Sequence, residues 1–152
     1  MDKQNNISPS DIQTSNFGPQ TSDFGPSGPV AYVFPPEWAE HEATWLSWPH
    51  KEASWPGKLD SIYPKYAEFI KYLSFSEKVG INVKDEAMKA VALSYISEAG
   101  ADLAQVEFYF NESNDAWCRD HGPAFLINPE AEVKKVIVDW GFNAWGGKYP
   151  PF

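Results

Sequence analysis

The amino-acid sequence predicts an α/β (α+β) domain from three observations. Apolar residues alternate with other residues at 79–83 and 106–110, and the stretch 43–48, which ends before a proline, also resembles a strand. Between these stretches apolar residues recur at helical spacing, so the order is strand, helix, strand, helix, strand. A hairpin pattern follows. With 152 residues, the chain fits one domain with a sizeable core.

The first strand is predicted over "ATWLSW" (43–48), and Pro49 ends it because proline cannot donate a ladder hydrogen bond. A helix follows, in which Ser61 is the expected cap. Pro64 would then lie in the first turn, where its missing N–H is harmless. The apolar residues at helical spacing are Leu59, Ile62, Tyr66, Phe69, Ile70 and Leu73.

The next elements are a strand over "VGINV" (79–83) and a helix from Asp85 to Ala99, which Gly100 is placed to terminate. The apolar face of this helix is predicted to comprise Met88, Val91, Ala92, Tyr95 and Ala99. The third strand is "VEFYF" (106–110). A hairpin is predicted from "AFLI" (124–127) and "VKKVIVDW" (133–140), with a turn around Asn128 and Pro129.

The first 29 residues have a different composition from the rest of the chain. "TSNFGPQ" (14–20) is followed by "TSDFGPS" (21–27), a near-repeat rich in Gly, Pro, Ser and Thr. Such a sequence cannot bury enough apolar area to offset chain entropy, so residues 1–29 are predicted to be a disordered tail. The folded part is expected to start at Val30, and the aromatic end "WGFNAWGGKYPPF" suggests the N-terminal piece of a longer protein.

Composition excludes several classes of partner. A net charge of −9 argues against nucleic acid and against an anionic membrane, whereas a small cationic substrate suits it. One cysteine excludes an internal disulfide. Because no apolar signal core or membrane-spanning run is present, a cytoplasmic location is the default prediction.

A metal site is not expected. His41, His50 and His121 have no ligand-pair spacing, and "HEATW" (41–45) lacks the second histidine of a zinc-protease helix. A structural zinc site would also need more than one thiolate.

The candidate site is the loop "NDAWCRDHGP" (114–123), which contains the single cysteine, Cys118. Arg119 and His121 could activate this thiol as a nucleophile. However, an extended segment would put Cys118 and Asp120 on one side and Trp117, Arg119 and His121 on the other. A buried spectator thiol is therefore the favoured interpretation.

Asp120 is the more interesting group in this loop. Between tryptophans and a Gly-Pro turn, it is expected to lie in a partly desolvated pocket, where an ionised carboxylate needs a cationic partner. That partner is either Arg119 or a bound guanidinium, and the residues alone leave both open. Asn114 and Asp115 have the pattern of turn residues whose side chains accept backbone hydrogen bonds.

A second cluster is "WGFNAWGGKYP" (140–150). Gly146 and Gly147 allow backbone conformations that other residues avoid or a close approach to a ligand. Trp140, Phe142 and Trp145 could form the walls of a cation slot or belong to the core.

Three blocks, "PPEWAEHEATWLSWPH" (35–50) with "WPGKL" (55–59), "NDAWCRDHGPAF" (114–125) and "WGFNAWGGKYPPF" (140–152), resemble the agmatine deiminases and bacterial-type peptidyl-arginine deiminases. Their order and separations match as well. The resemblance implies a pentein fold of five ββαβ modules, of which this chain would hold about two. It also implies hydrolysis of a guanidinium to a ureido group and ammonia, without metal or cofactor.

In this resemblance Asp120 matches the first guanidinium-binding carboxylate, and Trp117 matches a residue of the substrate pocket. Asn114, Asp115 and Arg119 match the supporting shell. A segment near the channel is matched by Asn143, Trp145 and Gly146. The family's nucleophilic cysteine, its histidine and its second carboxylate belong to downstream segments.

The resulting hypothesis is the N-terminal part of an agmatine deiminase, which makes N-carbamoylputrescine for polyamine synthesis and is inactive as this chain alone. A peptidyl-arginine deiminase and a non-catalytic binding module are the alternatives. The lack of a secretion signal favours the small amine. Whether the longer protein forms a homo-oligomer is left open by the sequence.

Overall fold

The structure is a computed structural model that describes residues 31–149. The predicted disordered tail (1–29) and its boundary at Val30 lie outside the described residues. No helix within the described part of the chain is long and apolar enough to cross a membrane.

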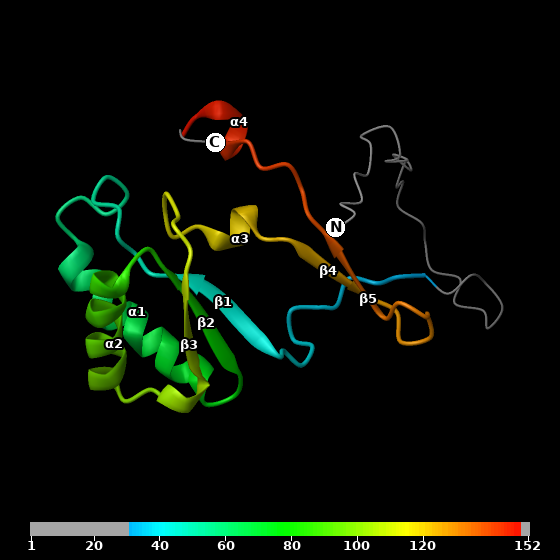
Figure 1. Cartoon of the computed structure of the whole chain (residues 1–152), viewed down its shortest axis with the longest axis horizontal. Helices are drawn as coiled ribbons and strands as arrows, with labels where there is room; N and C mark the ends of the chain where they lie inside the picture. The colour runs from blue at the N-terminus through cyan, green and yellow to red at the C-terminus, as the bar shows by residue number, and fades with distance from the viewer. Residues whose placement is uncertain (1–30, 150–152) are drawn as a thin grey trace, which may run out of the picture. The chain divides into compact units, whose positions relative to one another are not determined.

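A β-α-β-α-β unit forms the first half of the described chain, as the alternating periodicities predict. Its elements in order are β1 (Ala43–Ser47), α1 (Leu59–Ser74), β2 (Lys78–Val83), α2 (Glu86–Ala99), the short 3-10 helix η2 (Leu103–Gln105) and β3 (Val106–Phe110). The strands pair in parallel in the order β1-β2-β3. Each parallel pair is joined by a crossover helix, and both helices lie on the same side of the sheet (Figure 1).

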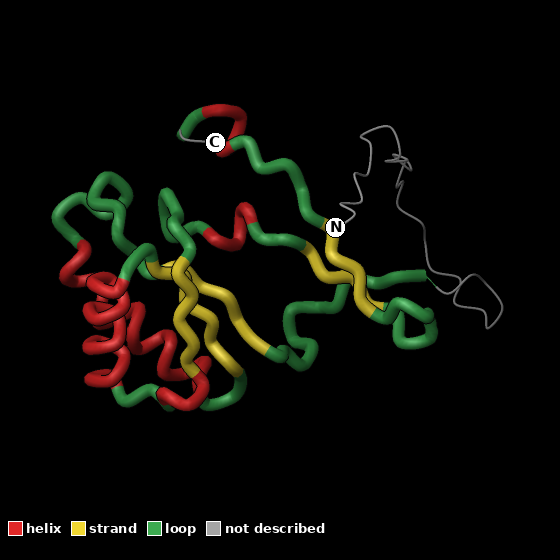
Figure 2. Tube along the Cα trace, viewed as in Figure 1, coloured by secondary structure: helices red, strands yellow, loops and turns green. Residues whose placement is uncertain are grey.

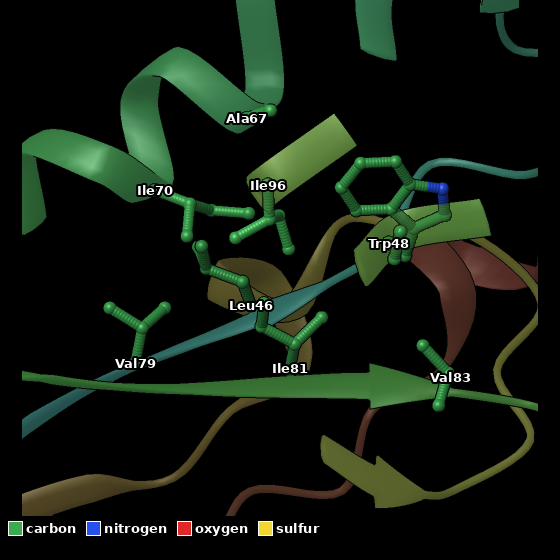
Figure 3. Close-up of a cluster of buried hydrophobic side chains, with 9 residues drawn as sticks. Leu46, Trp48, Ala67, Ile70, Val79, Ile81, Val83 and Ile96 are labelled. Carbon is green, nitrogen blue, oxygen red and sulfur yellow. The ribbon is translucent and has the colours of Figure 1, made fainter. Parts of the chain in front are cut away.

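The core lies between this sheet and the two helices. Alternate strand residues, among them Leu46, Ile81 and Val83, point at the helices and meet Ile70 and Ile96 (Figure 3). The largest buried side chain is Trp48, which packs against three tyrosine rings from α1 and α2. The intervening strand residues form the opposite face, where Trp45 covers Gly80.

The predicted start of α1 is wrong. The helix begins at Leu59 with Lys58 as N-cap and no side-chain cap, and the Ser61 hydroxyl donates to the Lys58 carbonyl at 2.8 Å. Pro64 therefore lies inside the helix instead of in its first turn. Hydrogen-bonded turns precede Leu59, with Lys58 N donating to Trp55 O at 2.9 Å, so the helix starts before Ser61 and needs no cap from it.

The predicted ends of α2 are confirmed, since Asp85 accepts a hydrogen bond from Met88 N at 2.8 Å and Gly100 is left-handed with a φ of 80°. The predicted apolar face is partly wrong. Val91 is 43% exposed, and Ile96, which the prediction omitted, is fully buried beside Ala92.

The predicted hairpin is present as the antiparallel pair β4 (Ala124–Ile127) and β5 (Lys135–Val138). The second strand is shorter than the predicted range 133–140. Its connection is longer than a tight turn. The buried side chain of Asn128 accepts from Glu130 N at 3.0 Å and organises that connection. Val33 forms a bridge to Ile127, so the start of the described chain borders the hairpin.

Candidate functional site

The polar loop of the sequence follows β3, and residues 111–123 are called the site loop below. It begins at the carboxyl edge of the parallel sheet, where ligands of open α/β sheets commonly bind. It contains the one-turn helix α3 (Cys118–His121), and the hairpin and α4 (Ala144–Gly147) follow it (Figure 2).

The segment 117–121 is helical and not extended, so the predicted alternation of its side chains is wrong. Asp120 N donates to Trp117 O at 3.1 Å, and Gly122 N donates to Cys118 O at 2.9 Å, which closes one helical turn. A Cβ atom at position 122 would lie 2.8 Å from the Cys118 carbonyl oxygen, so only glycine fits there. Gly122–Pro123 is a helix-stop signal that could have revealed this turn.

Cys118 is half-buried and engaged with the backbone. Its Sγ donates to the carbonyl of Trp45 at 3.3 Å, which ties α3 to β1. Burial raises the pKa of the Cys118 thiol, with backbone hydrogen bonds opposing that shift. An activated nucleophile needs a lowered pKa, so the burial of this thiol and its hydrogen bond both favour a spectator role.

The cation of Arg119 is directed away from Asp120. Both terminal nitrogens of the Arg119 guanidinium donate to the Glu37 carboxylate, one of them at 3.4 Å. The hydrogen bond and positive charge of Arg119 lower the pKa of Glu37, and Glu37 in turn raises the pKa of Arg119. Of the two partners left open for Asp120, the structure assigns Arg119 to Glu37. The sequence did not reveal Glu37 as the partner of Arg119, since no local pattern marks a partner 82 positions away.

Asp120 is exposed, which corrects the prediction of a partly desolvated position. It lies at the mouth of an open recess of about 240 Å³, whose tryptophan wall is itself largely exposed. Within residues 31–149 its side chain has no hydrogen-bond or ion-pair partner. The recess is lined by Asp120, His121, Gly122, Trp140, Gly141, Phe142 and Asn143.

The second cluster lines this recess with residues 140–143, and a left-handed turn follows directly. Ala144, Trp145, Gly146 and Gly147 all have positive φ, with values of 51°, 56°, 80° and 74°. Such backbone is unfavourable for Ala144 and Trp145, and the Asn143 side chain stabilises it by accepting from Gly146 N at 2.8 Å. Burial of Ala144 further fixes the turn.

Aromatic rings join the two clusters. His121 lies 5.8 Å from Phe142, which lies 5.2 Å from Trp145, measured between ring centroids. Trp140, however, is 70% exposed, so it is not a core residue in the described chain. The structure therefore brings Asp120 and Asn143 to one recess, with the Trp145 ring joined to its Phe142 wall.

The other predicted residues of the site loop contact residues 51–55. Asp115 accepts from its neighbour Ala116 N at 2.8 Å, as expected of a turn residue, but also from the Ser54 hydroxyl. Asn114 accepts from Lys51 Nζ at 3.2 Å, and the ring of Trp117 stacks on Trp55. These contacts to residues 51–55 were not anticipated.

Chemically, the arrangement offers a carboxylate that is unpaired within residues 31–149, next to aromatic rings in an acidic chain. A carboxylate can hold a planar guanidinium by two parallel hydrogen bonds, and aromatic faces attract cations. The described residues contain no group of three or more His, Cys, Asp or Glu side chains that could hold a metal ion.

Comparison with known proteins identifies the family. The profile of the Porphyromonas-type peptidyl-arginine deiminases matches residues 33–152. An agmatine deiminase of Stutzerimonas stutzeri is 33% identical over 117 residues, which cover 77% of this chain and 30% of that relative.

Solved structures give the same result. An agmatine deiminase of C. jejuni with substrate bound superposes with a TM-score of 0.63 at 30% identity, covering 79% of this chain and 33% of that one. A second C. jejuni agmatine deiminase structure gives a TM-score of 0.60 at 27% identity, covering 75% and 32% respectively. The chain thus spans about a third of the length of the proteins it matches, and its α/β class is theirs. It belongs to the Porphyromonas-type peptidyl-arginine deiminase family.

Proposed function

We propose that this chain is the N-terminal part of an agmatine deiminase, which hydrolyses agmatine to N-carbamoylputrescine and ammonia in putrescine synthesis. One observation carries the proposal: Asp120 has no partner within residues 31–149, while the neighbouring Arg119 is held by Glu37. The carboxylate is therefore available to a guanidinium from outside the chain.

In this proposal each oxygen of Asp120 accepts one N–H of the substrate guanidinium, and Trp117 offers an aromatic face. Asn114, Asp115 and Arg119 support the loop through the contacts described above. Asn143, Trp145 and Gly146 fix the opposite wall through their left-handed turn. No metal or cofactor takes part.

The nucleophile is proposed to lie outside the described residues, because Cys118 has a raised pKa and its thiol already bonds to the backbone. Residues 30–152 would then be the N-terminal part of a pentein catalytic domain, about two of its five modules. We expect these residues alone to bind the substrate without turning it over. A cytoplasmic location remains a prediction from the sequence.

A peptidyl-arginine deiminase is the second candidate, and the description of the matching family favours it. Agmatine is preferred because relatives covering three quarters of this chain are named agmatine deiminases. The two substrates share the guanidinium that Asp120 would bind and differ only at the far end.

The test is calorimetric titration of the purified chain with agmatine, with putrescine as the ligand that lacks a guanidino group. Asp120→Asn should weaken agmatine binding by about tenfold or more, as for a lost charge-assisted hydrogen-bond pair. Asp60→Asn makes the same charge change on α1 and should leave binding unaltered. Equal binding by wild type and Asp120→Asn would remove Asp120 from the site, and blocked arginine in place of agmatine tests the second candidate.

A further inference from the structure

Trp117 has one covered and one open face. Its ring stacks on Trp55 with centroids 6.1 Å apart and planes inclined by 16°. No other ring within residues 31–149 stacks on Trp117, and 46% of the residue is exposed. The orientation of the open face is therefore set by the ring behind it.

The segment that carries Trp55, residues 50–58, runs beside the site loop and is called the brace segment. The brace segment is a loop between β1 and α1, and the contacting part of the site loop lies between β3 and α3 (Figure 2). Four contacts join them in the same order along each segment, so the two run in parallel. These contacts are His50 Nε2 with Ser113 O at 3.0 Å, Lys51 Nζ with Asn114 Oδ1 at 3.2 Å, Ser54 Oγ with Asp115 Oδ2, and Trp55 with Trp117.

The brace segment is itself fixed by backbone hydrogen bonds. Trp55 N donates to Glu52 O at 3.1 Å, and Lys58 N donates to Trp55 O at 2.9 Å. The Glu52 side chain accepts from Gly57 N, where a left-handed φ of +62° turns the chain toward α1. Trp55 thus lies on a turn closed by hydrogen bonds, and Trp117 stacks on its ring.

The indole nitrogen of Trp55 does not contribute a hydrogen bond within the described chain. Its Nε1 is buried without a hydrogen-bond partner in the described chain. A buried donor without a partner is unfavourable, whereas a phenyl ring has no such group. What Trp55 contributes is ring surface against Trp117.

We propose that Trp55 is a positioning residue of the guanidino-substrate site: it holds Trp117 so that the open face of Trp117 receives the substrate. This inference rests on the proposed function. It assigns no direct contact between Trp55 and the substrate, because the ring of Trp117 would lie between them.

The experiment labels the whole chain with 5-fluorotryptophan and follows two quantities, the ¹⁹F resonance of Trp117 and the affinity for agmatine. Trp55→Ala should shift the Trp117 resonance and weaken agmatine binding about two- to tenfold, the range of aromatic pair contributions. Trp55→Phe keeps a ring and should restore most of the binding. Trp38→Ala removes an 87% exposed tryptophan and should change neither quantity.

The outcomes separate the two proposals. A wild-type chain that does not bind agmatine overturns the proposed function, whatever Trp55 does. Normal agmatine affinity and an unshifted Trp117 resonance in Trp55→Ala overturn the role of Trp55 alone. If Trp55→Ala fails to fold, Trp55→Leu takes its place, and equal binding by Trp55→Leu and Trp55→Phe contradicts a role for the ring.

Discussion

The β-α-β-α-β unit and the part of the chain that follows it, residues 111–149 (the site arm), are built in different ways. The unit buries apolar side chains from β1, β2, α1 and α2 in one cluster. In the site arm only Asn128 and Ala144 are buried. Burial therefore stabilises the unit, whereas hydrogen bonds, ring contacts and a strained turn position the site arm.

This difference separates stability from site geometry. The site loop is tied to β1 through Cys118, to residues 50–55 through the brace contacts and to Glu37 through Arg119. Each tie involves a few polar or aromatic atoms. We therefore expect changes in the unit to unfold the chain, and changes in the site arm to alter binding with the unit still folded.

The largest expected effect is on stability, from removing apolar volume in the unit. Ile81 is fully buried between the sheet and both helices, so Ile81→Ala should lower the free energy of unfolding by about 2–5 kcal/mol. Ile137 of β5 is 60% exposed, and Ile137→Ala should change it by less than about 0.5 kcal/mol. Urea denaturation followed by circular dichroism measures both, and equal losses would contradict the division.

The next effect is on the site. Gly122→Ala places a Cβ atom 2.8 Å from the Cys118 carbonyl oxygen, so the α3 turn must shift and carry Asp120 with it. This clash should cost about 1–3 kcal/mol locally, and we expect the agmatine affinity to fall by about tenfold. The α-helical circular dichroism signal of the unit should be retained. Ser97→Ala, at an exposed position of α2 that does not line the recess, is the control and should leave binding unaltered. Loss of binding in both variants would show that the clash at Gly122 is not the cause.

The same division explains what the sequence could predict. The order of elements in the unit follows from apolar spacing, and the Asp85 and Gly100 ends of α2 follow from local capping chemistry. Within α2, spacing alone could not decide between Val91 and Ile96. These residues lie on opposite flanks of the predicted apolar face, about 140° apart around the helix, and the sheet, not the sequence pattern, determines which flank is buried.

The site arm was less predictable because its decisive contacts are distant or sterically defined. The four-residue helix α3 depends on a backbone contact that only Gly122 allows. The pairing of Arg119 with Glu37 and the stacking of Trp117 on Trp55 link residues far apart in the sequence. Motif resemblance singled out Asp120 and Trp117 as candidates, but it gave no indication of the contacts that position them.

A smaller effect is expected at high pH, within the unit. Burial raises the pKa of Tyr66, whose hydroxyl donates to Ser47 O at 3.0 Å. Above about pH 10 the unfolded chain ionises this tyrosine while the folded chain keeps it neutral, so the contribution to stability is lost as pH rises through that range. Tyr66→Phe should show less of this alkaline loss, and Tyr72→Phe, at an exposed position of α1, should keep it. The urea midpoint of each variant, measured at increasing pH, tests this prediction. An equal alkaline loss in Tyr66→Phe and Tyr72→Phe would contradict it.

The smallest effect is expected at Cys118, the residue that a reader of the sequence would first choose as the nucleophile. Because burial raises its thiol pKa, iodoacetamide at about pH 8 should modify the folded chain more slowly than the same chain in concentrated urea. Cys118→Ala loses one weak hydrogen bond to Trp45 O and should lower stability by about 1 kcal/mol or less.

Agmatine affinity in Cys118→Ala sharpens the division further. Cys118 ties α3 to β1, but the bonds that close the turn are made by the backbone of residues 117–122. A variant without the thiol should therefore bind agmatine nearly as well as wild type. Rapid modification of the folded chain, or lost binding in Cys118→Ala, would make this thiol part of the site and return it to the candidates for the nucleophile.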